Sequence, residues 1–489
     1  MVCLVCATTS SFAQGGTNGV MVQAPLHEVR AVWLTTIGGL DWPHSYAQSA
    51  ASIERQQREL CTILDQLQRA NINTILFQAR IRGTVTYASK DEPWDGCLSG
   101  TPGKSPGYDA LEFAVRECHR RGMECHAWVV TIPCGKWNGF GAKALRQKFG
   151  NLVLKAGEEA YLDPSDSRTG DYLAKLCGDI ARRYDVDGIH LDYIRFPESL
   201  KKLPEANKGR SQITSVVKKI HDAVKREKGW IKLSCSPIGK HDDLKRYWSH
   251  GWNARTAVLQ DAQAWMRDGL MDMEFPMMYF RGNNFYPFAI DWQEHSYGKQ
   301  MVPGLGIYFM HPKEKNWPLV DITRELYVMR QYGMGHCFFR SKFLTDNTKG
   351  LYDFLCNEFN RYPALVPAKH GNGFKRPGAP ANVVQMNVGG RHYIAWDSAA
   401  DHSDGSYLVY NIFASTKYPV DTHDARNLVA MRVRGEMIEM KNSTGMYYAV
   451  TAVDRYGNEG EACQQKVGKT SPSGPAKPGW YYVTHPLGR

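Results

Sequence analysis

The sequence contains little that indicates nucleic-acid binding, a nucleotide cofactor or insertion into a membrane. Although the formal net charge is +11, Lys and Arg never form a run of five, and no zinc-finger spacing or RNA-binding aromatic signature occurs. No Gly-rich phosphate loop follows the first expected strand. Beyond the N-terminal stretch, no segment stays apolar over the about 18 residues that a spanning helix needs. We therefore expect no nucleic-acid partner and no membrane span, and the positive charge indicates only a mild attraction to anionic polymers such as cell-wall material.

The N-terminus resembles a truncated signal peptide. Residues 1–13 are largely apolar and end in Ser11-Phe12-Ala13, a small-x-small pattern like a signal-peptidase site, but a basic first segment is missing. A frayed N-terminus is the alternative. The signal-peptide interpretation predicts a secreted, periplasmic or cell-surface protein.

The cysteines do not form the pattern of a disulfide framework. Of the 12 cysteines, Cys3 and Cys6 lie in the expected signal peptide, and the others are scattered through 489 residues. Most fall on expected helices or strands, which is typical of buried small hydrophobic side chains. Cys97 and Cys134 lie in loops after consecutive strands, so these two could form a disulfide bridge.

From residue 29 the chain alternates short apolar runs rich in β-formers with longer amphipathic stretches. Such alternation predicts a parallel sheet covered by helices on both faces, and about 250 residues suffice for a minimal closed barrel. We expect an α/β fold, a (β/α)8 TIM barrel over residues 27–362, with an open doubly wound sheet as the alternative. The expected strands are 29–36, 74–80, 124–131, 188–195, 232–237, 271–279, 302–308 and 336–340, and the expected helices are 52–70, 108–121, 169–184, 212–228, 254–268, 320–332 and 347–359.

The composition changes after the expected barrel. Residues 363–380 are rich in Pro, Gly, Lys and Ala and are interpreted as a linker, and short alternating strands separated by turn residues follow over 381–468. This part resembles a fibronectin type III domain, with Trp396 on its second strand, Tyr410 on its third and Tyr456-Gly457-Asn458 after its last. The resemblance implies an all-β, immunoglobulin-like sandwich that acts as a spacer or surface-binding module. Residues 469–489 are expected to be a flexible tail.

In a parallel barrel the functional residues lie at the carboxyl ends of the strands. Polar and aromatic side chains gather at those positions, without a metal triad or a convincing Cys/His couple, so we expect neither a metal nor another cofactor. Aromatic faces can stack on sugars, and Arg and amide side chains can bind hydroxyl groups. Each residue alone is also compatible with core or loop packing. The predicted substrate-binding set is Trp33, Gln78, Arg80, His126, Trp128, Arg195, Tyr279, Arg281, Tyr308 and Arg340.

The strongest motif is Asp187-Gly-Ile-His-Leu-Asp192 at the fourth strand. Strand alternation places His190 and Asp192 on one face, and a carboxylate among apolar residues is costly to bury unless something uses or pairs it. Asp192 is therefore predicted to be the nucleophile or charge stabiliser beside an oxocarbenium-like transition state, with His190 or Arg195 keeping it ionised. The alternative is an Asp that pins a loop by accepting backbone hydrogen bonds.

Segments such as Glu28-Val-Arg-Ala-Val-Trp-Leu-Thr-Thr36, Phe77-Gln-Ala-Arg80 and Asp187-Gly-Ile-His-Leu-Asp192 carry a family resemblance. Through them the chain from about 27 to 345 resembles the glycosyl-hydrolase-like family 10 barrels. The resemblance implies a TIM barrel and glycan hydrolysis, with peptidoglycan glycan strands as one suggested substrate class. Two positions depart from the common family pattern: Tyr193 follows Asp192 where many members carry a second carboxylate, and Met277 stands where many carry Gln. The matching segments are Glu28-Val-Arg-Ala-Val-Trp-Leu-Thr-Thr36, Leu40-Asp-Trp-Pro43, Phe77-Gln-Ala-Arg80, Arg121-Gly-Met-Glu-Cys-His-Ala-Trp128, Leu162-Asp-Pro164, Asp187-Gly-Ile-His-Leu-Asp192, Ser236-Pro-Ile-Gly239, and Pro276 with Tyr279.

A glycosidase of this type needs a second carboxylate. Glu274 lies in an apolar strand, which would raise its pKa and suit a general acid, yet its parity is opposite to that of Met277 and Tyr279. Glu274 is thus either the acid or a structural residue facing the helices. The other candidates are Asp163, Glu198, Asp242, Asp243 and Asp41. We expect a glycoside hydrolase acting on a polysaccharide or cell-wall glycan, with a catalytically inactive glycan-binding barrel as the alternative and a lyase or transferase as a third possibility.

Overall fold

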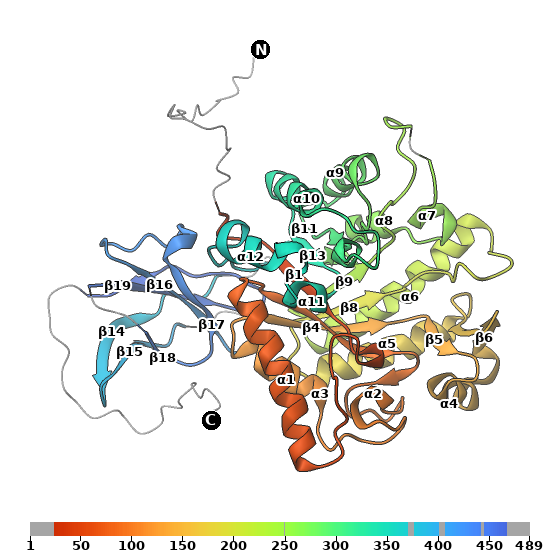
Figure 1. The fold of residues 1–489 in the computed structure, drawn as a ribbon, viewed down its shortest axis with the longest axis horizontal. Coiled ribbons are helices and arrows are strands. Elements are labelled where there is room, and N and C mark those ends of the chain that lie inside the picture. Colours follow the sequence, from red (N-terminus) through yellow and green to blue (C-terminus); the bar gives the residue numbers. More distant parts are fainter. Residues whose placement is uncertain (1–23, 249, 370–375, 401–405, 442–444, 467–489) are drawn as a thin grey trace.

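The computed structural model describes residues 24–248, 250–369, 376–400, 406–441 and 445–466. The expected signal peptide and C-terminal tail, and the middle of the expected linker, lie outside these residues. The described chain forms an α/β part followed by antiparallel sheets, which lie side by side in Figure 1. No helix of the described residues is long and apolar enough to cross a membrane.

All eight expected strands are present in one parallel sheet. Only Val302 and Pro303 separate β11 from β12, and β11 pairs with β10 whereas β12 pairs with β13. The two ends of the sheet therefore meet in one stretch of chain, as they do when a parallel sheet curves into a barrel. In spatial order the strands are β11 (Gln300–Met301), β10 (Met273–Glu274), β9 (Lys232–Ser236), β8 (Gly188–Asp192), β4 (Glu124–Val130), β2 (Thr74–Ile81), β1 (Arg30–Leu34), β13 (His336–Phe338) and β12 (Gly304–Leu305).

Helices follow the strands along the chain and cover the outside of the sheet (Figure 1). The helices α1 and α5 begin and end within two residues of the predicted bounds, whereas α6 begins six residues earlier than predicted. Ser49 is the N-cap of α1, and its side chain accepts from the Ser52 N–H. The helix expected over 254–268 is instead two short helices, and α9 was not predicted. The main helices are α1 (Ala50–Arg69), α3 (Ala110–His119), α5 (Ser167–Arg183), α6 (Ala206–Glu227), α7 (Ala254–Ala257), α8 (Ala262–Arg267), α9 (Tyr286–Glu294), α10 (Leu319–Gln331), α11 (Ser341–Thr345) and α12 (Leu351–Phe354).

An insertion follows β4 at its carboxyl end and was not predicted. It consists of α4 (Phe140–Phe149) and a small antiparallel sheet with the order β5 (Pro133–Lys136), β7 (Glu159–Leu162) and β6 (Val153–Ala156). A second, shorter excursion after β2 holds β3 (Thr84–Val85) and α2 (Gly96–Ser99). Both stand on the rim where the strands end.

The apolar side chains of the parallel strands belong to two clusters, one on each face of the sheet. One lies between the strands and the helices and includes Ile189 and Leu191, and the other fills the inside with Trp33, Trp128 and Phe275 among others. Alternation along each strand sends neighbouring side chains to opposite faces. The inside of the curved sheet is therefore packed with side chains, and access from solvent is limited to the rim.

The C-terminal region is all-β and antiparallel, as predicted. One sheet has the order β14 (Ala381–Val388), β15 (Arg391–Asp397), β18 (Met437–Glu439), and the other has β17 (Leu428–Val433), β16 (Val409–Ser415), β19 (Tyr447–Val453), β20 (Cys463–Gln464). Residues of both sheets, including Trp396, Tyr410 and Tyr448, belong to one apolar cluster. The likeness to a fibronectin type III domain remains a prediction.

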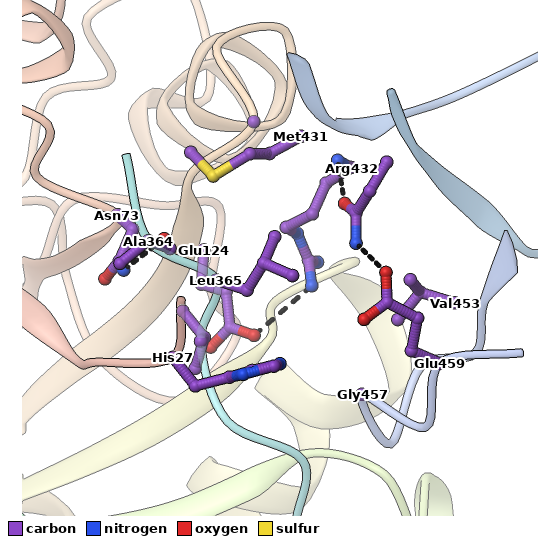
Figure 2. Close-up of a pocket in the computed structure, with 13 residues that line it drawn as sticks. His27, Asn73, Glu124, Ala364, Leu365, Met431, Arg432, Val453, Gly457 and Glu459 are labelled. Carbon is purple, nitrogen blue, oxygen red and sulfur yellow. Dashed lines mark hydrogen bonds and ion pairs between the residues drawn. The ribbon is translucent and has the colours of Figure 1, made fainter. Parts of the chain in front are cut away.

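The C-terminal region docks on the amino ends of the parallel strands, opposite the rim. Arg432 of β17 reaches Glu124 at 3.2 Å and Asp187 at 2.5 Å, and Arg455 reaches Asp187 at 3.1 Å. Figure 2 shows the small pocket at this seam and the Arg432 side chain that extends across it toward Glu124. Although burial alone would raise it, the pKa of Asp187 is held well below its usual value by Arg432, His119 and Arg455.

The bridge that Cys97 and Cys134 could have formed is absent, since both thiols are free. All ten cysteines of the described residues are free. Cys134 lies on β5, and its thiol donates to the Ile132 carbonyl oxygen at 3.5 Å. Burial, the first cause in each case, raises the pKa of both thiols, to about 12 for Cys134.

Candidate active site

A cleft of about 550 Å³ opens at the carboxyl ends of the parallel strands. Its walls come from the residues after β1, β2, β4, β8, β10 and β13 and from the insertion. This is the edge at which the functional residues of a parallel barrel are expected. Six of the predicted site residues line it: Gln78, Trp128, Asp192, Arg195, Tyr279 and Arg340.

Asp192 is a buried carboxylate held by donors on both of its oxygens. Oδ1 accepts from the Ser236 hydroxyl at 2.7 Å and from the Tyr193 N–H at 2.9 Å. Oδ2 accepts from the Trp128 indole N–H at 3.1 Å. Burial raises the pKa of Asp192, and these hydrogen bonds together with the charge of Arg195 counteract the increase. The side chain is therefore oriented before any ligand arrives.

His190 does not line the cleft, and its two ring nitrogens bond to residues other than Asp192. It is fully buried, its Nε2 accepts from the Trp33 indole N–H at 3.2 Å, and its Nδ1 lies 2.9 Å from the Ser234 hydroxyl. Burial and the nearby His126 lower the pKa of His190 well below its usual value, so the ring is neutral. The prediction that His190 keeps Asp192 ionised is corrected, because a neutral imidazole supplies no charge. Trp33 likewise belongs to the packed interior.

Arg195 combines burial with unused donors. Its side chain is only 4% exposed, and its Nη2 lies 3.3 Å from Glu198. Its Nε and Nη1 are buried and have no hydrogen-bond partner among the described residues. The guanidinium also lies over the Tyr193 ring, 4.1 Å from its centroid. Because Arg195 lines the cleft, its positive charge favours an oxygen of a ligand there.

Gln78 and Arg340 hold the loop after β1. The amide oxygen of Gln78 accepts from the N–H groups of Thr36 and Ile37, both at 2.9 Å. Arg340 donates to the Leu40 carbonyl oxygen at 2.7 Å and pairs with Asp41. Asp41 also accepts from Thr35 N–H at 2.9 Å, which makes it a structural residue of the loop.

Aromatic side chains form another part of the wall. Tyr279 lines the cleft, and its ring lies 5.5 Å from Phe339 and 5.9 Å from Tyr308 between centroids. Tyr308 thus supports Tyr279 from behind and is absent from the cleft wall. Arg281 does not line the cleft either, and it pairs with Asp321 at 2.7 Å.

Two further predicted sugar-binding residues are buried away from the cleft. Arg80 is fully buried and binds Glu92 at 2.6 Å and the Thr131 carbonyl oxygen at 2.8 Å. His126 is fully buried beside Glu124 at 3.1 Å, near the amino end of β4. The prediction is corrected for both. Arg80 is paired on the helix-facing side of the sheet with Glu92, which also accepts from Tyr172 of α5, and His126 is enclosed in the interior beside Glu124, so a sugar reaches neither.

The structure places Glu274 on the helix-facing side of the sheet. Its neighbours Met273 and Phe275 point into the interior cluster, so alternation directs Glu274 outward. There its Oε1 lies 3.9 Å from the Cys235 sulfur. Burial raises the pKa of Glu274 well above its usual value, which keeps it protonated. The prediction of a general acid in the site is therefore corrected.

Among the described residues, the carboxylates that line the cleft besides Asp192 are Glu159 and Glu198. Glu198 was among the sequence candidates. Glu159 was not, because it lies on β7 of the unpredicted insertion, where it pairs with Lys136 at 2.7 Å. Asp163, Asp242 and Asp243 do not line the cleft. Within the described parts of the chain no three His, Cys, Asp or Glu side chains are grouped so that they could hold a metal ion.

Comparisons with known proteins match this region. Residues 28–208 match the family glycosyl hydrolase-like 10. Glycosyl hydrolase YngK of Bacillus subtilis (strain 168) is 26% identical over 380 residues, which cover 70% of this chain and 73% of that protein. Glycosyl hydrolase DigH of Escherichia coli (strain K12) is 28% identical over 302 residues, 54% of this chain and 69% of that protein.

Solved structures resemble the fold at low sequence identity. The β-amylase catalytic domain of Paenibacillus polymyxa has a TM-score of 0.46 at 11% identity and covers 70% of this chain and 99% of that one. The α-L-fucosidase isoenzyme 2 of Paenibacillus thiaminolyticus has a TM-score of 0.45 at 13% identity and covers 68% of this chain and 49% of that one.

Proposed function

We propose that this protein is a glycoside hydrolase that cleaves a polysaccharide or cell-wall glycan, with Asp192 at the reacting centre. The single observation that carries the proposal is the state of Asp192: a buried carboxylate on the wall of the cleft, with three donors on its two oxygens. The similarity to proteins named glycosyl hydrolases supports it. Peptidoglycan glycan strands are the substrate class to test first, and secretion to the periplasm or cell surface accords with it.

The role of Asp192 follows from its surroundings. In a retaining reaction it would attack the anomeric carbon, and in an inverting one it would orient water or stabilise the positive charge of the transition state. Ser236 and Trp128 donate to different oxygens, so the carboxylate cannot rotate freely. A fixed carboxylate stabilises an oxocarbenium-like transition state without reorganisation at the moment of reaction.

The second carboxylate is Glu198 or Glu159. Glu198 follows β8 in the chain and lies beside Arg195, whereas Glu159 stands on the wall formed by the insertion. A general acid protonates the leaving oxygen, and a leaving group that needs no proton makes it dispensable. The variant that lacks the general acid should therefore hydrolyse an activated aryl glycoside far better than a natural glycosidic linkage. Asp192→Asn should lose activity on both kinds of substrate. Glu198→Gln and Glu159→Gln identify which residue is the acid.

Several other groups would bind the sugar. Arg195 brings a positive charge to the cleft wall, and Gln78 uses its amide oxygen for the loop, which leaves its NH2 group to donate. Tyr279 and Trp128 present aromatic surface to the same cleft. Tyr193 occupies the place of a second family carboxylate, has a positive φ of 53°, and lines the wall.

The test is the release of new reducing ends from a panel of polysaccharides that includes intact and peptide-free peptidoglycan. Asp192→Asn should lower kcat about a thousandfold, the upper end of the range that loss of one electrostatic group produces. Asp346→Asn, an exposed Asp paired with Lys342, is the matched control. Activity that survives Asp192→Asn would remove Asp192 from the centre. Binding without any hydrolysis by the wild-type protein would instead favour a glycan-binding barrel.

We also propose that the C-terminal region is a fibronectin type III-like sandwich. Two antiparallel sheets with one shared apolar cluster support this assignment. Its position at the amino ends of the parallel strands leaves the cleft uncovered.

A further inference from the structure

A second hollow, of about 750 Å³, lies beside the cleft on the same rim. We call it the side groove. The side groove and the cleft share the lining residues Arg82, Gly135 and Glu159, so the two hollows adjoin and form one continuous track along the rim. One wall is the insertion after β4, and the other consists of the loops that follow β1 and β2.

Two exposed aromatic rings stand in the side groove. Tyr46 is 57% exposed and Phe140 is 49% exposed. Each lies against glycine: a Cβ at Gly100 would meet the Tyr46 ring at 3.0 Å, and one at Gly103 would meet the Phe140 ring at 2.8 Å. The rings are thus seated on bare backbone while their outer faces remain open. Rings held in this way can stack on the apolar faces of sugars with little loss of side-chain freedom.

Polar groups accompany the rings. Arg82 is exposed on the boundary between the two hollows and forms no ion pair within the described residues. Lys136 and Glu159 pair across the insertion sheet at 2.7 Å. Aromatic platforms with a few hydrogen-bonding groups are the ordinary composition of a site that binds hydroxyl-rich chains.

Aromatic rings also stand on the other side of Asp192. The Arg195 guanidinium lies 5.9 Å from the centroid of Trp252, and Trp248 of the same loop is 78% exposed. Both tryptophans follow β9, whereas the side groove lies beyond β2 and β4. Asp192 on β8 is therefore flanked by exposed aromatic residues in both directions along the rim.

We propose that the side groove binds the distal sugars of a polysaccharide whose scissile bond lies at Asp192, so that the enzyme cleaves internal bonds. This inference rests on the proposed function and specifies its mode of action. A groove that continues past the reacting centre accommodates a chain on both sides of the bond. An enzyme that removes terminal units needs a closed end at one side of its cleft, and the track through Arg82 into the side groove is open.

The experiment compares Tyr46→Ala/Phe140→Ala with the wild-type protein on two probes, long peptide-free peptidoglycan glycan strands and their tetrasaccharide fragments. Stacking on an aromatic ring contributes about 1 kcal/mol, so two rings correspond to roughly a tenfold to thirtyfold change. We expect kcat/KM for long strands to fall at least about tenfold further than kcat/KM for the tetrasaccharide. Tyr332→Ala is the control, since Tyr332 is 46% exposed and lines neither hollow.

The size of the first products is the second measurement. Internal cleavage yields strands of intermediate length early in the reaction. Release of only terminal units, or an equal loss on both probes, would overturn the inference while leaving the hydrolase intact. If the wild-type protein hydrolyses neither probe, the proposed function fails, and binding of long strands to wild type and double variant decides about the side groove. In that case, equal affinity of the wild-type protein and the double variant for long strands would overturn the inference. A side groove that binds a peptide but no glycan strand would overturn it as well.

Discussion

Arg432 is predicted to be the residue that most strongly couples the C-terminal region to the parallel sheet. Its guanidinium contacts two buried carboxylates, Glu124 at 3.2 Å and Asp187 at 2.5 Å, and its side chain is 13% exposed. Removing one partner of a buried ion pair costs about 3–5 kcal/mol, because the remaining charge has lost its compensation. Lys232 still pairs with Glu124 at 2.6 Å, and Arg455 still pairs with Asp187, so Arg432→Ala should cost about 3 kcal/mol, the lower end of that range.

The free energy of unfolding in urea at pH 7 measures this loss. Arg434→Ala is the matched control, because Arg434 is largely exposed and lies 3.8 Å from Asp185. An exposed pair of this kind contributes about 0–1 kcal/mol. In the background of Asp187→Asn, Arg432→Ala should cost less, since one of its two partners no longer carries a charge. A loss no larger than that of the control, or full additivity of the two substitutions, would refute the reasoning.

The same ion pairs set the response to acid. Burial favours the neutral form, yet Lys232, His126 and Arg432 hold the pKa of Glu124 at about 2 instead of 4.5. A carboxyl group with a lowered folded-state pKa stabilises the fold fully above its unfolded pKa, and that stability is lost as the pH falls toward the folded value. The wild-type protein should lose this contribution between about pH 4.5 and 2. In Arg432→Ala the folded-state pKa rises, so the variant should have less of this stability to lose over that pH range.

Two further substitutions test the site. Trp128→Phe removes the N–H that donates to Asp192 at 3.1 Å, so we expect kcat to fall about tenfold to a hundredfold. Because the pKa of Asp192 rises in this variant, the acidic limb of the pH profile should move to higher pH. An unchanged acidic limb would mean that the ionisation of Asp192 does not set it. Glu274→Gln should leave kcat/KM unchanged, because Glu274 faces the helices, and loss of activity in a folded variant would return it to the site. Since the pKa of Glu274 is raised by burial, the wild-type protein loses stability as the pH rises above the unfolded value, whereas Glu274→Gln does not, and unfolding at pH 7 should find the variant at least as stable.

The sequence alone determined the α/β alternation, the positions of eight of the nine parallel strands and the change to antiparallel strands near residue 381. These features depend on local patterns, namely apolar runs, amphipathic periods and turn residues, which act within a few neighbouring positions. The sequence also singled out Asp192, because a carboxylate at the end of an apolar strand is rare and therefore stands out without any structure. The position of the cleft followed from the rule that parallel strands present their carboxyl ends at one edge.

The tertiary structure decided which of the remaining polar residues reach the cleft. Arg80 and Arg340 both stand at strand ends, yet Arg80 pairs with Glu92 between the sheet and the helices, whereas Arg340 borders the cleft. Glu159 reaches the cleft wall because it lies on an insertion that the sequence analysis did not predict. Glu274 faces away from the cleft because the residues on either side of it, Met273 and Phe275, point to the interior. Arg432 meets Asp187 across 245 positions of chain. Such pairings depend on the geometry of closure and docking, which long-range packing sets and no local pattern contains.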